Sequence, residues 1–297
     1  MTRFDAFAGR KTAEALSAVI EPFETDEDSG GGDVVAIGNA WSRRLFDGPF
    51  YVSPAPSGDL PAVSLVFVRS RDGDTVARNP STLGGGEADK HLIYEGLSRA
   101  AADGVLSGAA TVRGSDLVFS VWHPELVALR ASLGLARHPL QIVATLHGMD
   151  LEHDLMFNVP ELPVAVITAA RGAAAMRDGL AARPWITAIE MNNANDLAGA
   201  LSELRRRGIR QLSCIGGRTL AAPLIDAGLI QDLYLTTSAR SGGAPNTPVS
   251  ATPLHGRTVV RKHGTGTDAG VVFEHLRIEH RSLGSRLRAT DDPPPHT

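Results

Sequence analysis

The sequence of 297 residues contains a single cysteine, Cys214, which excludes an intrachain disulfide and a metal site built from several cysteines. Cys214 lies inside an apolar run, where we expect a buried, unreactive thiol. No apolar run approaches the roughly 18 residues that a membrane helix needs. The first residues, MTRFDAFAGRK, lack the pattern of a signal peptide. We therefore expect a cytoplasmic protein without a membrane partner.

Basic charge is also scarce. The net charge is −4 and no block of basic residues is present, so nucleic acid is not an expected partner. The short cluster Arg205–Arg207 ends a helical pattern, where cations complement the helix dipole. The ten histidines show no metal-ligand spacing, so no metal site is expected. A Walker motif, a complete GxGxxG and a GxSxG elbow are all absent.

Strand and helix patterns alternate from residue 62 to residue 235, which predicts an α/β fold with a mostly parallel sheet flanked by helices. The predicted strands are 62–68, 105–106, 140–146, 164–168, 185–190, 211–215 and 229–235, with a late strand at 271–280. The predicted helices are 87–102, 124–133, 173–180, 196–207 and 219–227. Segment 108–112 is expected to be a short helix or a loop.

The ends of the chain are less regular. Residues 1–60 are interpreted as an extension packed on a main domain of residues 61–284, with a helix at 12–20. The acidic, glycine-rich segment 21–33 is predicted to be a mobile loop. Segment 34–41 is left open between helix and strand, and the proline-rich segment 49–61 between a linker and an edge segment. Residues 285–297, with three consecutive prolines, are predicted to be a disordered tail.

The central stretch is 210–235, RQLSCIGGRTLAAPLIDAGLIQDLYL. A strand passes through Gly216 and Gly217 directly into a helix, and such a helix N-terminus offers backbone N–H groups to an anion. The glycines let a phosphate approach the backbone closely. By itself, the same pattern also describes a tight strand-to-helix turn without a ligand. Four turns, at 70–73, 108–112, 168–171 and 216–219, are expected at the carboxyl edge of the sheet, where ligands bind in such folds.

Four segments resemble those of the C-terminal reductase domain of the bacterial riboflavin-biosynthesis deaminase-reductase and of the stand-alone pyrimidine reductase family. The resemblance covers about residues 61–280. The family's strand followed by SLDG is similar to residues 68–73, VRSRDG, and its LGG-ADK segment to residues 83–90, LGGGEADK. Its RA-ADxxLxGAGTV is similar to residues 99–112, RAAADGVLSGAATV. Its EGGxxLxxxLLxAGLVDEL is similar to residues 215–233, IGGRTLAAPLIDAGLIQDL.

The resemblance implies a dihydrofolate reductase-like fold and NADPH as the cofactor. It places one group of residues around the nicotinamide ribose and the phosphates and a second group at the diphosphate. The first group is Gly108, Ala109 and Thr111, and the second is Gly216, Gly217, Arg218, Thr219 and Leu220. Thr168 and Arg171 are implied for the adenosine 2′-phosphate, with Thr145 as a further candidate of the same kind. An exposed arginine without a ligand is the alternative for Arg171.

The substrate side departs from the family pattern. The family's glutamate before the double glycine is Ile215 here, and its lysine or asparagine four residues before the SLDG serine is Val66. Ser70 and Asp72 are implied at the floor under the nicotinamide, or they form a plain turn. Asp72 is the candidate acid or base, with a bound water as the alternative. Losing the partner of a polar substrate group costs about 1–3 kcal/mol, so the substrate half of the site is predicted to have changed.

The resemblance implies an NADPH-dependent oxidoreductase similar to 5-amino-6-(5-phosphoribosylamino)uracil reductase of riboflavin biosynthesis. Hydride would pass directly from the nicotinamide to a C=N or C=O carbon of a small-molecule substrate. The alternative is a non-catalytic relative that binds a nucleotide and acts as a sensor or partner subunit. A homodimer is implied by the resemblance, with the late strand 271–280 as an interface candidate.

Overall fold

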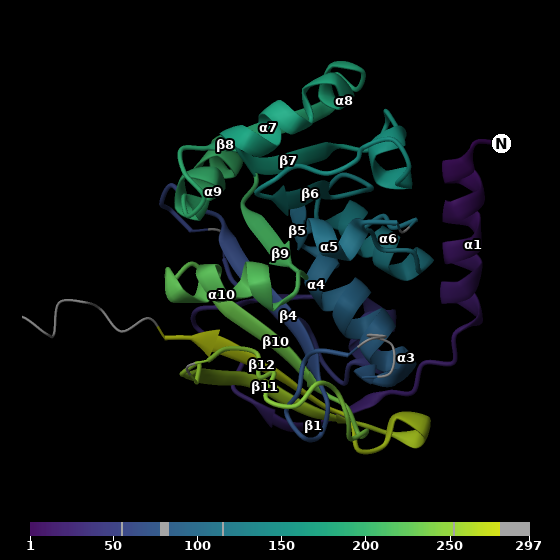
Figure 1. Ribbon diagram of the computed structural model, residues 1–297. Helices are drawn as coiled ribbons and strands as arrows, with labels where there is room; N and C mark the ends of the chain where they lie inside the picture. Colours follow the sequence, from purple (N-terminus) through teal and green to yellow (C-terminus); the bar gives the residue numbers. More distant parts are fainter. Residues whose placement is uncertain (55, 78–82, 115, 252, 280–297) are drawn as a thin grey trace, which may run out of the picture.

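The computed structural model describes residues 1–54, 56–77, 83–114, 116–251 and 253–279. Their main element is one ten-stranded sheet in the order β1-β11-β12-β10-β4-β9-β5-β6-β7-β8 (Figure 1). Neighbouring strands from β10 to β8 are parallel, and those from β10 to β1 are antiparallel. The predicted α/β fold with a mostly parallel sheet and late antiparallel strands is confirmed. The parallel strands are β4 Ala62–Arg69, β5 Gly104–Gly108, β6 Leu140–Thr145, β7 Val164–Ala169, β8 Ile186–Met191, β9 Gln211–Cys214 and β10 Asp232–Thr237.

Alternate side chains of these strands enter cores on opposite faces of the sheet, as period-2 geometry requires. In β4, Val63 and Leu65 enter one core while Val66 enters another. The helices α9 Leu197–Arg206 and α10 Arg218–Asp226 cover the Leu65 face. The remaining helices and helical turns are α1 Arg3–Ser17, α2 Ala40–Leu45, α3 Gly86–Ala88, η2 Asp89–Leu97, α4 Ser98–Ala100, α5 Ala109–Val112, α6 Pro124–Ser132, η3 Leu155–Asn158, α7 Ala170–Ala175, α8 Arg177–Ala181 and η4 Gly266–Asp268. None of the helices in the described parts of the chain has the length and apolar character that crossing a bilayer requires.

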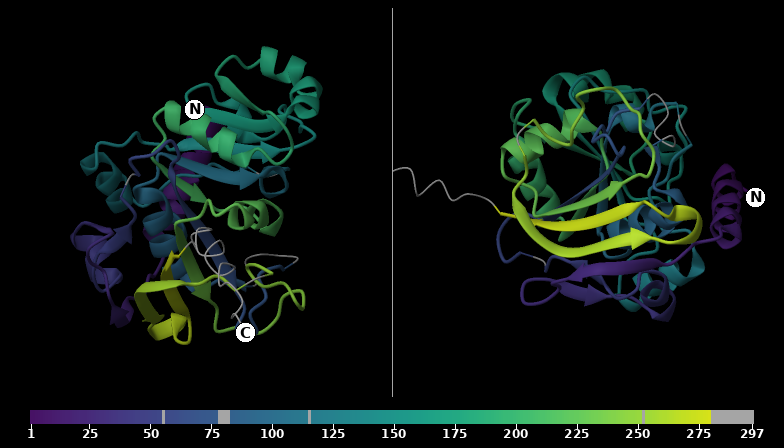
Figure 2. Two further views of the ribbon diagram at one scale, coloured as in Figure 1. Left: turned by 90° about the vertical axis from the view of Figure 1, so that its left-hand side faces the viewer. Right: turned by 90° about the horizontal axis from the view of Figure 1, so that it is seen from below.

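The prediction of a mobile loop at 21–33 is wrong, because β1 Phe23–Asp28 pairs antiparallel with β11 Gly256–Gly264. The reason is charge complementarity across the two strands. Glu24 lies opposite His263, and Glu27 lies opposite Arg261. β12 Val272–Ile278 lies between β11 and β10, so the antiparallel strands extend the sheet beyond β10 (Figure 2). The sequence prediction missed β11 and placed the start of β10 three residues too early.

The rest of the N-terminal region is more regular than its sequence indicates. The first helix is α1, which starts well before the predicted residue 12, because Thr2 and Asp5 form a capping box. The segment 34–41 contains β2 Val35–Ile37 and the start of α2, and β2 pairs with β3 Phe50–Val52. β3 is buried, so the proline-rich segment 49–61 begins with a strand. The predicted tail 285–297 and His280 lie outside the described residues.

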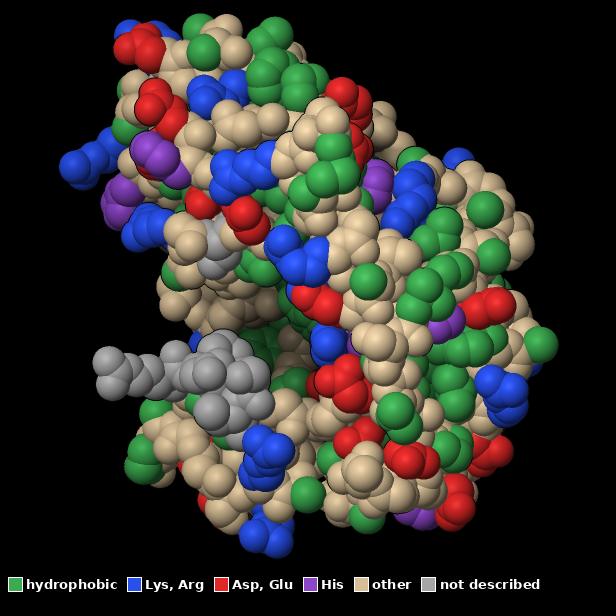
Figure 3. Space-filling model, turned by 90° about the vertical axis from the view of Figure 1, so that its right-hand side faces the viewer, with side chains coloured by type: hydrophobic (Ala, Val, Ile, Leu, Met, Phe, Trp, Pro, Cys, Tyr) green, Lys and Arg blue, Asp and Glu red, His purple; other side chains and the backbone are tan. Residues whose placement is uncertain are grey.

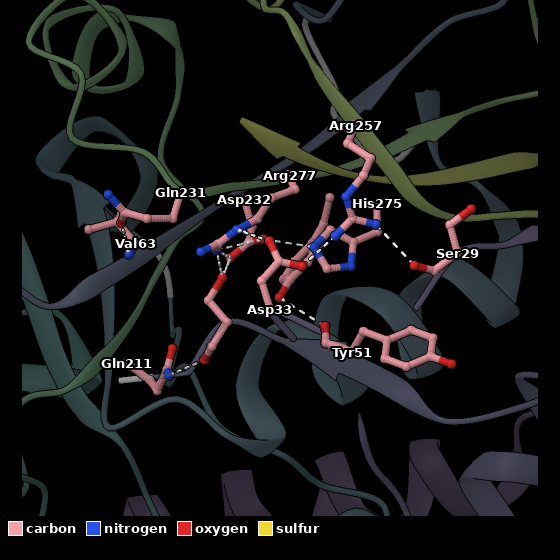
Figure 4. A network of polar contacts seen from close by, with 12 residues as sticks. Ser29, Asp33, Tyr51, Val63, Gln211, Gln231, Asp232, Arg257, His275 and Arg277 are labelled. Atoms are coloured by element: carbon pink, nitrogen blue, oxygen red, sulfur yellow. Dashed lines mark hydrogen bonds and ion pairs between the residues drawn. The ribbon is translucent and has the colours of Figure 1, made fainter. Parts of the chain in front are cut away.

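A buried polar network ties the N-terminal region to the sheet (Figure 4). The Asp232 carboxylate lies 2.9 Å from Nε2 of His275 and 3.3 Å from a guanidinium nitrogen of Arg277. The Ser53 hydroxyl donates a hydrogen bond to the same carboxylate. Arg277 also pairs with Asp33 at 3.4 Å. Side chains from β10, from β12 and from two N-terminal segments therefore belong to one network of ion pairs and hydrogen bonds.

Candidate active site

Two adjoining hollows lie at the carboxyl ends of the parallel strands, where β9 separates β4 from β5. The first, about 290 Å³ in volume, is here called the β5–α10 hollow. It is lined by Gly108, Ala109, Ala110, Thr111, Ala144, Thr145, Leu146, Met191, Ala194, Leu197, Gly217, Thr219, Leu220 and Pro223. The second, about 500 Å³, is called the β4–η2 hollow. It is lined by Val66, Phe67, Val68, Thr75, Val76, Ala77, Leu83, Asp89, Tyr94, Thr111, Leu117, Ile215, Gly216 and Gly217.

The two hollows share Thr111 and Gly217, so together they form one cleft that is divided at the N-termini of α5 and α10. The space-filling view shows a deep indentation on one side of the molecule, with hydrophobic side chains visible inside it (Figure 3). Such a concave, largely apolar surface with a few polar groups is typical of small-molecule sites.

Gly108 and Gly217 directly precede α5 and α10, and a Cβ atom on either would meet no atom within 4 Å. Their φ angles, −80° and −59°, are open to any residue. Neither backbone conformation nor packing inside the protein therefore requires glycine at these two positions. Because these two glycines have no side chains, the space next to their backbone in the cleft stays open. A ligand that lies against the backbone needs such a space.

The helices that start at this cleft have no side-chain cap. The residues before α5 and α10, Gly108 and Gly217, have no side chain to accept a hydrogen bond from the first helical N–H groups, whereas the Asp196 carboxylate caps α9 by accepting the Gly199 N–H at 3.0 Å. The carboxylate of Asp196 would repel an anion, so the N-terminus of α9 does not offer an anion site. The nine-residue helix α10 presents its first N–H groups and the positive end of its dipole toward the cleft.

Gly216 has a different role from Gly217. A Cβ atom on Gly216 would come within 2.9 Å of Leu220 Cδ2 and 3.0 Å of the Gly108 nitrogen. Glycine is therefore required where the turn after β9 crosses the end of β5. Since Ile215 also donates its N–H to the Leu106 carbonyl at 3.0 Å, this contact holds the two turns of the cleft against each other.

Most of the residues predicted for the cofactor converge on this cleft. Gly108, Ala109, Thr111, Thr145, Gly217, Thr219 and Leu220 line the β5–α10 hollow, and Gly216 lines the β4–η2 hollow. Three others are not among the lining residues. Thr168 is fully buried beneath α7, where a Cβ on Gly172 would come 2.1 Å from its hydroxyl. Arg171 is exposed, and Arg218 is half-buried in the first turn of α10.

The predicted substrate-side residues separate into two pairs. Val66 and Ile215 both line the β4–η2 hollow, which places the two departures from the family pattern in one site. Ser70 is fully buried and accepts the Asp74 N–H at 3.2 Å, so it holds a turn. Asp72 is exposed and accepts the Gly242 N–H at 2.9 Å, which ties this turn to the following loop.

Sequence reasoning missed Asp89, the first residue of η2 and one of the residues lining the β4–η2 hollow. Asp89 is 6% exposed, and its carboxylate accepts a hydrogen bond from the Thr236 hydroxyl. Burial raises its pKa to about 6, with a further increase from the charge of Asp268, against the opposing hydrogen bonds of Thr236 and the Gly85 backbone. The signal was present in the sequence, because Asp89 lies in the segment 83–90 that resembles the family's LGG-ADK.

Charge in the cleft is confined to one place. The described residues that line the β5–α10 hollow are all uncharged, and those that line the β4–η2 hollow include one carboxylate, Asp89. The one trio of described residues with metal-ligand geometry is Asp150, Glu152 and His153, which is fully exposed and outside both hollows. What the cleft offers chemically is therefore backbone N–H groups at one end and a buried acid at the other.

Solved structures of reductases show a similar fold. A pyrimidine reductase-like protein from Corynebacterium diphtheriae matches with a TM-score of 0.62 and 19% identity over 74% of this chain and 93% of that one. RibD from Acinetobacter baumannii matches with a TM-score of 0.59 and 20% identity over 75% of this chain and 60% of RibD, so the present chain corresponds to part of that protein. The riboflavin biosynthesis reductase of Saccharomyces cerevisiae matches with a TM-score of 0.52 and 16% identity, covering 76% and 93%.

Among curated protein sequences, none matches this chain significantly. The model of the RibD C-terminal domain matches residues 61–271, which is most of the chain and includes every strand of the parallel part of the sheet. This match agrees with the resemblance in the four motif segments and with the fold of the solved reductases. The chain belongs to the RibD C-terminal domain family.

Proposed function

We propose that the protein is a reductase that binds NADPH in the cleft and transfers hydride directly to a C=N or C=O carbon of a small substrate. The observation that carries the proposal is the uncapped N-terminus of α10 together with two glycines, Gly108 and Gly217, both of which face open space. A diphosphate fits that arrangement, because it is an anion that must approach the backbone closely. Membership of the RibD C-terminal domain family supports the same ligand.

The cofactor and the substrate are assigned to different parts of the cleft. The β5–α10 hollow is assigned to the adenosine and diphosphate, with α10 stabilising the negative charge. The nicotinamide, which supplies the hydride, is assigned to the junction at Thr111 and Gly217. The substrate then occupies the β4–η2 hollow, where the protein positions it and excludes water.

The substrate is proposed to be less polar on two sides than a ribosylaminopyrimidine phosphate. Val66 is 8% exposed and Ile215 is half-buried, and both line the β4–η2 hollow. Neither can form the hydrogen bonds that the family's lysine or asparagine and glutamate provide. A site that lacks these partners discriminates against substrates that need them.

These two replacements also favour a second candidate function, a non-catalytic relative that binds the nucleotide and acts as a sensor or partner subunit. The two candidates share the cofactor half of the cleft and differ in turnover. The double variant Val66→Asn and Ile215→Glu separates them further. Pyrimidine reductase activity gained by this variant would indicate a retuned catalytic site rather than a lost one.

The test has two stages. First, NADPH is titrated into the protein while energy transfer from the three tryptophans to the nicotinamide is recorded. Saturable binding is expected, and its absence at millimolar NADPH would overturn the proposal. Second, NADPH oxidation is followed with ribosylaminopyrimidine phosphate and a panel of imines and carbonyl compounds. Tight binding without oxidation of NADPH by any of these would favour the sensor instead.

We also propose that the protein forms a homodimer. β12 is not available for strand pairing between subunits, because β10 and β11 occupy its two edges. The edges of the described sheet are β1 and β8. Sedimentation equilibrium gives the oligomeric state directly, and a monomer at all accessible concentrations would contradict the proposal.

A further inference from the structure

A buried carboxyl group lies in the half of the cleft that is assigned to the substrate. Asp89 is 6% exposed and lines the β4–η2 hollow together with Val66, Tyr94 and Ile215. The described lining of that hollow has no other carboxyl group. A buried acid costs free energy in an apolar site unless it is paired, so its presence there needs an explanation.

The surrounding structure holds this carboxyl group in a fixed position. The Thr236 hydroxyl on β10 donates a hydrogen bond to one carboxylate oxygen, and Gly85 provides a backbone contact. The carboxylate of Asp268, from η4, accepts the Ala88 N–H at 3.0 Å at the start of the same helical segment. Gly86, with φ of +81°, is required there, because a Cβ atom would come 1.8 Å from Asp268 Oδ1. Strand β10, through Thr236, and the connection between β11 and β12, through Asp268, thus position one acid at the cleft.

The helical segment itself is unusual. Asp89 begins a nine-residue π-helix, a rare conformation that is frequently found at functional sites. A core that needed only an apolar lining would be satisfied by an ordinary helix with an aliphatic residue at this position. The buried acid, its three supports and the rare helix therefore point to one chemical role.

We propose that Asp89 is the acid that protonates the substrate during hydride addition. This inference rests on the proposed reductase function. As hydride adds to the carbon, the π bond of the C=N or C=O group opens and its electron pair moves to the nitrogen or oxygen. The O–H bond of Asp89 breaks and its proton goes to that atom. The carboxylate that remains is stabilised by Thr236 and Gly85 until it takes a proton from water.

The charges around Asp89 predict how its titration responds to substitution. Asp268, from η4, is the described charged group that acts on the titration of Asp89, and the surrounding segment 87–95 also carries Glu87, Lys90, His91, Tyr94 and Glu95. β10 contributes the uncharged Thr236. Glu87 pairs with Lys90 at 3.3 Å and with His91 at 3.1 Å. Asp268 raises the pKa of Asp89, whereas the hydrogen bond from Thr236 lowers it.

The experiment measures NADPH oxidation against pH, with ribosylaminopyrimidine phosphate or the best acceptor of the panel, for the wild type and four variants. In the wild type, kcat is expected to fall as the pH rises through about 6, because the acid must be protonated. Asp89→Asn preserves the shape of the side chain and should lower kcat about 100-fold or more, remove this limb of the profile and leave NADPH affinity unchanged. Asp178→Asn, an exposed aspartate on α8, is the control that should change nothing.

Two further variants distinguish a proton donor from a structural carboxylate. Asp268→Asn keeps an acceptor for the Ala88 N–H but removes the charge, so the limb should move to lower pH. Thr236→Val removes the hydrogen bond to the ionised form, so the limb should move to higher pH. Opposite shifts support the proposal. The proposal would be overturned if Asp89→Asn kept the wild-type kcat and the decrease of kcat with rising pH. An inactive wild type would overturn the reductase function and the proton donor together.

Discussion

The Gly216 Cα lies against the end of β5, so that a Cβ atom on Gly216 would come 3.0 Å from the backbone nitrogen of Gly108. The two glycine turns of the cleft thus pack on each other. This contact places the N-termini of α5 and α10 side by side at the point where β9 separates β4 from β5. The geometry of the proposed anion site therefore depends on Gly216, which faces the protein, and access to it depends on Gly217, which faces the cleft.

Gly216→Ala is expected to destabilise the protein. The added methyl group would meet Leu220 Cδ2 at 2.9 Å and backbone atoms at 3.0 and 3.3 Å, and the backbone of β5 cannot move away cheaply. Overpacking of this kind costs about 1–3 kcal/mol. Urea unfolding followed by circular dichroism measures the loss. An unchanged free energy of unfolding would show that the turns are not in close contact.

Asp232→Ala is expected to lower stability without affecting NADPH binding. The change leaves His275, which is fully buried, and Arg277 without their shared carboxylate. Removing one partner of a buried ionic network costs roughly 3 kcal/mol. Asp232 starts β10, at the end of the sheet opposite to the cleft. If Asp232→Ala lost NADPH affinity in proportion to its loss of stability, this result would contradict the separation of the Asp232 network from the cleft.

His138 is expected to contribute to acid sensitivity. Burial, together with the charges of Arg137 and Arg130, lowers its pKa to about 4. As the pH falls below 6.5, the unfolded chain gains a proton that the folded protein does not take up until about pH 4, so stability decreases across this window. His138→Gln removes that titration and should flatten the curve of unfolding free energy against pH. An identical slope in the variant and the wild type would count against this cause.

Cys214 is expected to resist thiol reagents in the folded protein. The residue is fully buried in β9, and burial raises its pKa to about 11, against a smaller opposing effect of the Gly216 N–H. The reactive thiolate is therefore scarce at pH 8. Labelling with Ellman's reagent should occur only after unfolding in urea. Fast labelling under native conditions would show that β9 opens locally.

The parallel part of the sheet could be predicted from the sequence because each of its strands is a short apolar run next to a helical pattern. β1 and β11 could not, because β1 is rich in acidic residues and β11 in basic ones, and β1 becomes the edge of the sheet only by pairing with β11. Lys262 shows the reason. It is almost fully buried in β11, and its ammonium group donates to Thr25 Oγ1 at 2.6 Å and to the Asp47 carbonyl at 3.0 Å, both far away in the sequence.

The same limit applied to the site. The glycine turns were found because turn chemistry is local, and Gly108 and Gly217 indeed line the cleft. Asp89 lies in a segment that resembles the family's LGG-ADK, but its environment includes Thr236 and Asp268, which no local pattern connects to it. Asp72, the acid chosen from the sequence, is exposed and bonded to Gly242. The pH profiles above test whether Asp89 supplies the proton.

A comparison of Gly217→Val with Gly58→Val tests the proposal that NADPH lies against Gly217 at the N-terminus of α10. A Cβ on either residue meets no protein atom within 4 Å, and neither has a positive φ, so both variants should keep wild-type stability. Only the first places a side chain in the cleft. We predict that NADPH affinity, measured by tryptophan energy transfer, falls at least tenfold in Gly217→Val and is unchanged in Gly58→Val, a tenfold change being about 1.4 kcal/mol. Equal affinity in the two variants would contradict the account.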